Sequence, residues 1–230
     1  MVHNDVSAAL DAEATALLAA AFLLTDADLA KASPCAPWTI GELACHVLIG
    51  ASRIRQALAE PERSDGRLVS TAEYYRRDER FSAATNADRI ESARALARQL
   101  PGPGEIAAEL DRRCRESAEL LAAAPAGRTV ITRHGDRMLL SEFARTRVVE
   151  LAVHGLDLAQ GLSRPPWLTS KAADVLEDLL LLPAGGSSQL CRDLACDRTG
   201  LIARLTGRTS LSRAEQQVLR DAGIRKLAFG

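Results

Sequence analysis

Apolar and polar residues alternate with helical spacing over most of the chain. The segment 39-TIGE-42 also has the spacing of a capping box, which marks the start of a helix. Amphipathic periodicity predicts four helices in the first half of the chain, over 7–24, 39–57, 71–100 (with a break near Asn86) and 105–124. The first of these is apolar on almost every side, which is typical of a central position in a bundle.

The second half of the chain begins with a different pattern. In residues 128–140, a run of β-branched residues precedes a His-Gly-Asp turn and apolar residues follow it, which predicts a short hairpin. Ser141 is then expected to cap a helix that ends near Gly161. Further helices are expected from Thr169 or Ser170 to about Leu182, and over 199–206 and 212–222. The pattern therefore predicts a mainly all-α protein, with a bundle of four or five helices over 1–165 and a small helical region over 166–230.

Composition narrows the classes of protein that this chain can be. With 29 basic and 30 acidic residues among 230, the net charge is -1, so the basic excess typical of nucleic-acid binding is missing. The longest apolar run is shorter than the roughly 20 residues that a membrane span needs. The five cysteines form no CxxC pair, and no secretory signal precedes the first helix. We therefore expect a cytoplasmic protein that contacts neither nucleic acid nor membranes.

The basic residues are almost all arginine, since only three lysines occur. Together with frequent alanine and leucine, this bias is typical of GC-rich coding sequences and favours an actinobacterial source.

Polar residues follow one line through the otherwise apolar segment 147-RVVELAVHGLDLAQ-160. Glu150 and His154 are four residues apart and so share one helix face, and Asp157 continues that face. A carboxylate among apolar residues needs a partner or a wet cavity. A divalent metal ion is such a partner, because a glutamate and a histidine one turn apart can reach the same ion.

A third ligand is available in 43-LACHVLIG-50, where His46 stands in the middle of an apolar helix. If the two helices are neighbours, His46, Glu150 and His154 form a set of two histidines and one carboxylate. Three protein ligands leave a position open for water or substrate, as in catalytic zinc sites.

The same residues also allow interpretations that involve no metal ion. A glutamate–histidine pair one turn apart often makes only a weak surface contact, and a core histidine is more often hydrogen-bonded than metal-bound. Asp157 is expected either to accept the second ring N–H of a ligand histidine or to bridge to an arginine or a helix end. Cys45 is expected to be a small buried side chain.

The segments 38-WTIGELACHVLIG-50 and 139-LLSEFARTRVVELAVHGLDLAQGL-162 together resemble the mycothiol-dependent maleylpyruvate isomerase family, which belongs to the DinB-like superfamily. The segment 198-RTGLIARLTGRTSLS-212 resembles the C-terminal region of that family. The resemblance implies an up-down four-helix bundle, a divalent ion held by His46, Glu150 and His154, with zinc as the favoured metal, and mycothiol as thiol cosubstrate. Catalytic roles fall on these three residues and on Asp157.

Family members catalyse different reactions, including isomerisation of maleylpyruvate and transfer of sulfur from mycothiol. The family's isomerase is expected to carry a longer C-terminal α/β part with an arginine that acts on the substrate. The shorter helical tail here favours S-transfer to a small-molecule electrophile or thiol conjugate. Arg204 and Arg208 are candidates for contact with an anion, but a solvated helix surface is the favoured expectation for both.

A pocket for a sugar-bearing thiol needs polar side chains at the open end of the bundle. Arg53, Arg147 and Tyr74 are the candidates for binding it, with Tyr75 beside them. A metal-dependent hydrolase and a regulatory bundle without enzyme activity remain alternatives, since the same ligands serve each. The sequence leaves the oligomeric state open, with a homodimer as one arrangement.

Overall fold

The computed structural model describes residues 2–76, 78, 82–181, 186–224 and 227, and the side chains of 2–4 are not included in that description. Its helices are α1 (Val2–Ala21), α2 (Asp26–Leu29), α3 (Ile40–Ala51), α4 (Arg53–Ala59), α5 (Thr71–Tyr74), α6 (Ala83–Gln99), α7 (Pro103–Ala123), α8 (Leu140–Gly161), α9 (Ser170–Leu180), α10 (Ser187–Asp193), α11 (Arg198–Leu205) and α12 (Arg213–Asp221). None of the described helices is long and apolar enough to cross a membrane.

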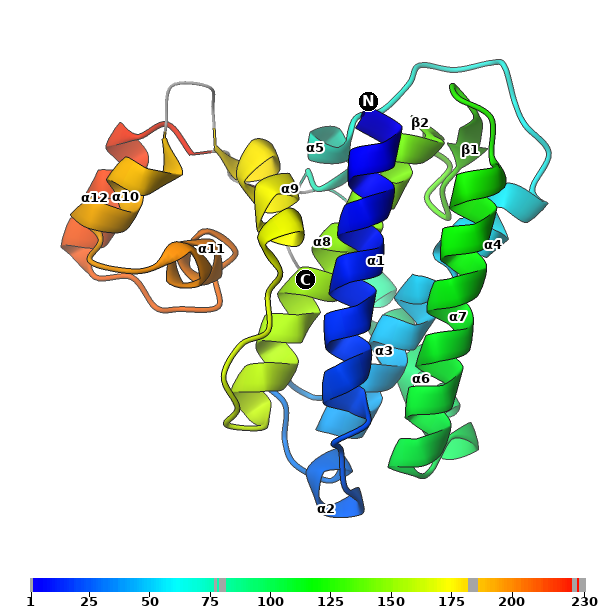
Figure 1. Ribbon diagram of the computed structural model, residues 1–230, viewed down its shortest axis with the longest axis horizontal. Helices are drawn as coiled ribbons and strands as arrows, with labels where there is room; N and C mark the ends of the chain where they lie inside the picture. Colours follow the sequence, from blue (N-terminus) through cyan, green and yellow to red (C-terminus); the bar gives the residue numbers. More distant parts are fainter. Residues whose placement is uncertain (1, 77, 79–81, 182–185, 225–226, 228–230) are drawn as a thin grey trace.

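Four long helices form the body of the molecule. Helix α1 packs against α7 and α8, and α3 packs against the same two helices from the other side (Figure 1). Fully buried aliphatic side chains of these helices, such as Leu43, Leu48 and Val148, contribute to the core. The predicted mainly all-α helical bundle is therefore confirmed.

The start of α3 shows how the sequence fixes a helix end. Thr39 Oγ1 accepts a hydrogen bond from the Glu42 backbone N–H at 3.2 Å, and Glu42 Oε2 accepts one from the Thr39 N–H at 2.9 Å. The predicted capping box is confirmed. Because this cap fixes the first turn, it also fixes which residues of α3 face the bundle.

The helix expected over 39–57 is divided at Ser52, which separates α3 from α4. The guanidinium of Arg113, on α7, donates to the Leu48 carbonyl at 3.0 Å and to Ser52 Oγ at 2.9 Å. Ser52 Oγ in turn donates to the Leu48 carbonyl at 3.1 Å. These bonds supply partners for groups at a helix end and make the break possible.

The helix expected over 71–100 is also divided, into α5 and α6, and the break precedes the one expected near Asn86. Helix α6 begins after Ser82, whose hydroxyl accepts a hydrogen bond from the Thr85 N–H.

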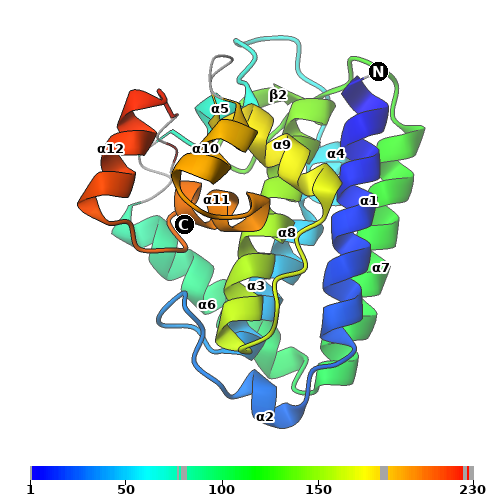
Figure 2. The same ribbon diagram turned by 60° about the vertical axis from the view of Figure 1, so that its left-hand side comes forward.

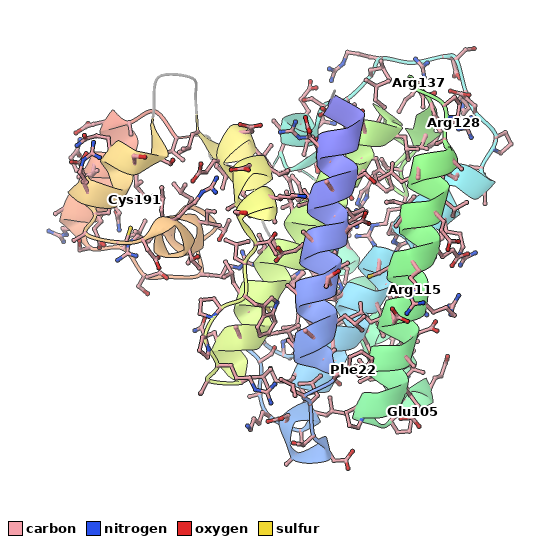
Figure 3. The ribbon with its side chains drawn as sticks, viewed as in Figure 1. Phe22, Glu105, Arg115, Arg128, Arg137 and Cys191 are labelled. Atoms are coloured by element: carbon pink, nitrogen blue, oxygen red, sulfur yellow. The ribbon has the colours of Figure 1, made fainter. Side chains whose placement is uncertain are left out.

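The predicted hairpin is present as β1 (Thr129–Ile131) and β2 (Arg137–Leu139), paired antiparallel with Val130 opposite Met138. Gly135, at φ +81°, allows the turn. Arg128 and Arg137 mark this end of the bundle in Figure 3. Strand β2 continues directly into α8, so the helix begins at Leu140 and the prediction that Ser141 caps it is wrong.

Helix α9 packs on α1 and α8 and contributes to the main core. The buried carboxylate of Glu13, on α1, accepts hydrogen bonds from the Thr169 N–H at 3.0 Å and from its hydroxyl at 2.7 Å. Burial raises the pKa of Glu13, although these bonds act in the opposite direction. Thr169 itself caps α9, as one of the two predicted candidates.

Helices α10 to α12 surround a second, smaller apolar cluster that includes Leu190, Leu194 and Leu201. Figure 2 shows this group beside α8 and α9, and the label Cys191 marks it in Figure 3. Arg198 ties it to α9 through ion pairs with Glu177 and Asp174. The short helices expected in the tail are confirmed, and the domain boundary at 165 stays a prediction.

Candidate metal centre

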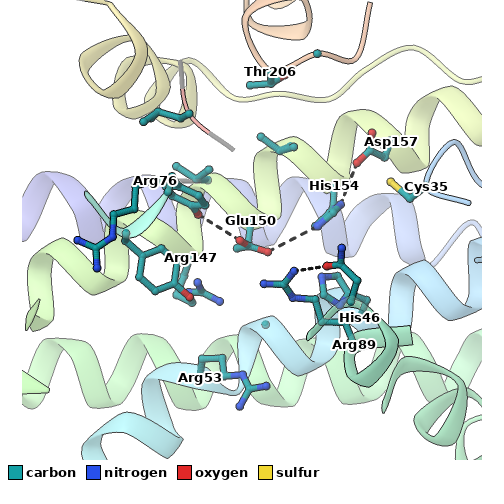
Figure 4. A pocket seen from close by; sticks show the side chains of 18 of the residues that line it. Cys35, His46, Arg53, Arg76, Arg89, Arg147, Glu150, His154, Asp157 and Thr206 are labelled. Carbon is teal, nitrogen blue, oxygen red and sulfur yellow. Dashed lines mark hydrogen bonds and ion pairs between the residues drawn. The ribbon is translucent and has the colours of Figure 1, made fainter. Parts of the chain in front are cut away.

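The structure brings the three predicted ligands together where α3 faces α8. One nitrogen or oxygen atom from each of His46, Glu150 and His154 lies within 4.8 Å of the other two. His154 Nε2 is 3.7 Å from Glu150 Oε2, and the two imidazole rings are 5.0 Å apart at 89° (Figure 4). The spacing along α8 places Glu150 and His154 on one face, and the packing of α3 on α8 adds His46.

This donor set fits a divalent ion. Two ligands about 2.1 Å from a tetrahedral ion are roughly 3.4 Å apart, close to the 3.7 Å between His154 Nε2 and Glu150 Oε2. Two imidazoles and one carboxylate suit zinc, and a fourth position would remain open toward the cleft. Metal ligation by these three residues is nevertheless a prediction.

Asp157 fixes the orientation of His154. Its Oδ2 lies 2.9 Å from His154 Nδ1, and because a carboxylate only accepts, the ring N–H donates to it. Burial would raise the pKa of Asp157, but the hydrogen bonds from His154 and Arg208 outweigh it and hold the pKa well below its usual range. The other ring nitrogen, Nε2, faces Glu150.

Arg208 completes this chain of contacts from the C-terminal region. Its guanidinium donates from Nε to Asp157 Oδ1 at 3.0 Å and from Nη2 to Asp157 Oδ2 at 3.1 Å. The side chain is 9% exposed. The expectation that Arg208 lies on a solvated helix surface is therefore wrong, because it follows α11 and turns inward onto α8. Arg204 instead pairs with Glu215 in the C-terminal cluster.

Two aromatic side chains contact the other two predicted ligands, His46 and Glu150. Trp38 stacks on His46 with ring centroids 4.6 Å apart and an angle of 28°. The Tyr75 hydroxyl lies 3.2 Å from Glu150 Oε1 and 3.0 Å from the Thr146 carbonyl, so it can donate to either. Burial, followed by the charge of Glu150, raises the pKa of Tyr75 well above its usual value, which keeps the hydroxyl a donor.

Protonation states in the metal-free protein suit ligation. Burial, reinforced by the neighbouring His154, lowers the pKa of His46 to about 3. Burial would raise the pKa of Glu150, but nearby positive charge, that of Arg147 first, outweighs it and brings that pKa to about 2. His46 is therefore a neutral imidazole and Glu150 a carboxylate at neutral pH, the forms that bind metals.

The lowered pKa of His46 predicts a pH dependence of stability. Below its ordinary value of 6.5, the unfolded chain binds a proton that the folded chain does not, so stability is lost between about pH 6.5 and 3. In the metal-free protein, this group contributes a slope of up to about 1.4 kcal/mol per pH unit. Urea denaturation between about pH 7 and 5, with a chelator present, should give a shallower decline for His46→Gln. Equal declines would contradict this assignment.

Cys35 also lies near the centre, which the sequence did not indicate. Its sulfur, His154 and Asp157 form a second group of ligand atoms within 4.8 Å. Burial, then the charge of Asp157, raises the pKa of this thiol to about 12. The oxygens of Asp157 are already bound by His154 and Arg208, so this group is less suited to an ion than the first.

The centre opens into a wide cleft of about 2830 Å³ between the bundle and the C-terminal helices. The residues expected to bind the thiol, Arg53, Arg147 and Tyr74, all line it, and their contact with the thiol stays a prediction. Arg147 is buried, donates from Nε to Thr146 Oγ1 at 3.0 Å, and lies over the Phe143 ring.

Arg89, on α6, and Arg133, in the hairpin turn, line the same cleft. Because these two arginines are far apart in the sequence, nothing in the sequence indicated that both would line this cleft. Arg208 had a weak signal, since it lies in the segment 198–212 whose resemblance to a family was noted.

Comparison with known proteins identifies the family. Residues 10–159 match the model of the mycothiol maleylpyruvate isomerase N-terminal domain. No curated protein sequence matches the chain. The crystal structure of a mycothiol-dependent maleylpyruvate isomerase has the same fold, with a TM-score of 0.58 and 13% identity over 90% of each chain. A histidine-to-alanine mutant of that isomerase matches with 11% identity, the same TM-score and the same coverage.

The equal coverage shows that the solved isomerase and this chain are of similar length. The expectation of a longer C-terminal part in the isomerase is therefore wrong for that structure. The family model covers the helices that carry His46, Glu150 and His154 and spans more than half of the sequence. This chain therefore belongs to the mycothiol maleylpyruvate isomerase N-terminal domain family, within the DinB-like superfamily.

Proposed function

We propose that the protein is a divalent-metal-dependent enzyme that uses mycothiol and transfers its sulfur to a small-molecule electrophile. The observation that carries this proposal is the convergence of His46, Glu150 and His154 on the wall of an open cleft. Family membership supports mycothiol as the thiol. Zinc is the proposed metal, because the donor set suits it.

The chemistry that a bound divalent ion supplies is a lowered thiol pKa, which gives thiolate at neutral pH. The protein's own residues prepare the ligands. Asp157 selects the tautomer of His154 by accepting the Nδ1 proton, and Arg208 holds Asp157 in place. Trp38 restrains His46 by stacking, and Tyr75 restrains Glu150 by a hydrogen bond. Ligands fixed in advance in this way need little rearrangement when the thiol binds.

In S-transfer, the thiolate sulfur forms a bond to an electrophilic carbon, and the bond from that carbon to its leaving group breaks with the electron pair on the leaving group. The width of the cleft allows the thiol and the electrophile to bind side by side. Tyr74 and other polar side chains of its wall are proposed to hold the hydroxyl groups of the sugar-bearing thiol.

Cis–trans isomerisation is the second candidate, and the similar length of the solved isomerase favours it. There the thiolate adds to an activated double bond, the resulting single bond rotates, and the thiolate leaves. The thiol is regenerated in isomerisation but consumed in S-transfer, which separates the two reactions.

The test is consumption of mycothiol by the zinc-loaded protein in the presence of monobromobimane, with cysteine as a control thiol. S-transfer predicts enzyme-dependent loss of mycothiol and formation of its bimane conjugate. A parallel reaction with maleylpyruvate, followed by its absorbance, detects isomerisation without loss of thiol. Saturable binding of mycothiol without either reaction would contradict the enzyme assignment and support a regulatory bundle.

A further inference from the structure

The C-terminal helices carry a pair of cysteines that the proposed function does not use. Cys191 lies in the last turn of α10 and Cys196 follows that helix, and both pack against the small apolar cluster of α10 to α12. Both side chains are partly exposed, and neither lines the cleft beside the candidate metal centre. Figure 3 shows Cys191 in the group of helices that lies apart from the four long ones. The pair is therefore a thiol site separate from that centre.

The backbone at the end of α10 holds these two residues side by side. The Ala195 N–H donates to the Arg192 carbonyl at 3.2 Å, and the Cys196 N–H donates to the Cys191 carbonyl at 3.0 Å. With Ala195 in the left-handed region at φ +46°, these two bonds form a Schellman motif, in which the side chains of the outer bonded residues often touch. Cys191 and Cys196 occupy those two positions. A disulfide requires two backbones that are held this close.

The two thiols are themselves in contact, since a hydrogen bond joins the side chains of Cys191 and Cys196. Burial, followed by the charge of a Cys196 thiolate, raises the pKa of Cys191. A raised pKa reduces the fraction of thiolate, which is the attacking form. Cys191 is therefore poorly suited to attack an external disulfide first, and better suited to attack a sulfur that Cys196 already holds beside it.

The turn that brings the cysteines together depends on the folded state. Glycine is the usual residue in the left-handed region, and Gly207 occupies the matching position after α11 at φ +79°. Ala195 carries a Cβ, so the same conformation is disfavoured for it in a free chain. Leu190 and Leu194, both buried in the small apolar cluster, hold the end of α10 in place. The proximity of the two thiols should therefore be lost when the chain unfolds.

We propose that Cys191 and Cys196 are a redox-active thiol pair, which a low-molecular-weight disulfide oxidises to an intramolecular disulfide. The Cys196 thiolate attacks one sulfur of the small disulfide, whose S–S bond breaks and releases one thiolate with the electron pair. Cys191 then attacks the Cys196 sulfur, which forms the bond between the two cysteines and releases the second thiolate. The protein loses two electrons and two protons, and the small disulfide is reduced to two thiols.

The test equilibrates the full-length protein, with a chelator present, in a fixed ratio of oxidised to reduced glutathione, followed by acid quenching, alkylation and tryptic peptide mapping. Arg192 stands between the two cysteines, so trypsin separates them into peptides 172–192 and 193–198, which stay joined only through the disulfide. We expect the ratio of joined to separate peptides to be at least about tenfold higher for the folded protein than for the chain in urea, because the folded turn raises the effective concentration of one thiol beside the other.

Two variants sharpen the test. Cys191→Ser should stop at a mixed disulfide between Cys196 and glutathione, because the second attack is lost. Cys114→Ser is the matched control, since Cys114 is also a partly exposed thiol but stands on α7, and its variant should give as much joined peptide as the wild type.

A ratio no higher in the folded protein than in urea would overturn the proposal. Equal cross-linking of Cys196 to Cys35 or Cys114 would overturn it as well, because it would show that the turn does not select the pair. Since neither mycothiol nor metal is present, failure here leaves the proposed S-transfer untouched, and failure of S-transfer leaves this thiol pair untouched.

Discussion

Replacing His154 with alanine is expected to abolish both metal binding and thiol turnover. His154 lies between Glu150 and His46, and its Nε2 is already directed toward Glu150 by the bond from Nδ1 to Asp157. Removing the ring leaves two ligands, which are too few to hold a divalent ion tightly at this kind of site. Elemental analysis should give near one equivalent of metal in the wild type and near none in His154→Ala.

His46→Ala and Glu150→Ala should behave in the same way, because each also removes one of three ligands. His134→Ala is the control, since His134 lines the same cleft outside the ligand set and its variant should keep the metal. Circular dichroism of each variant separates loss of metal from loss of fold. Full metal content and full activity in His154→Ala would refute the assignment of this centre.

Replacing Asp157 with asparagine is expected to weaken metal affinity by about 10- to 100-fold, the effect usual for the partner of a ligand histidine. Asparagine keeps the size of the side chain but removes the charge that favours Nδ1–H on His154. Its single amide oxygen can accept only some of the hydrogen bonds that the two oxygens of Asp157 accept from His154 and Arg208. Competition with a fluorescent zinc chelator measures the dissociation constant directly.

Arg208→Gln serves as the comparison for this variant. It leaves the contact between Asp157 and His154 in place, so its effect on metal affinity should be smaller than that of Asp157→Asn. An Asp157→Asn protein with wild-type affinity would show that the carboxylate has no part in preparing the ligand. A larger effect from Arg208→Gln would show that the arginine acts by another route.

Contacts within one helix were the part of the site that the sequence could predict. Glu150, His154 and Asp157 share a face of α8 because helical spacing alone places them there. His46 could be added because an imidazole amid apolar residues of α3 had to face the bundle interior. These inferences needed only periodicity and the energetic penalty for burying unpartnered polar groups.

Contacts between elements that are far apart in the sequence could not be predicted from periodicity and burial alone. Trp38 and Cys35 reach the centre from the connector before α3, whose path depends on tertiary packing. Arg208 is separated from Asp157 by 51 positions, and the resemblance of its segment to a family did not indicate which residue it contacts. The division of the second helix at Ser52 depends on a guanidinium from α7, which no local propensity predicts.

The hydrogen bonds between Arg208 and Asp157 connect the C-terminal region to the candidate metal centre. Metal binding and the docking of Arg208 are therefore expected to influence each other. If docking of this arginine tightens the hold of Asp157 on His154, then metal loading must favour docking by the same free energy. An increase in metal occupancy would then strengthen the contact between Arg208 and Asp157, and loss of that contact would weaken metal binding by the same free energy.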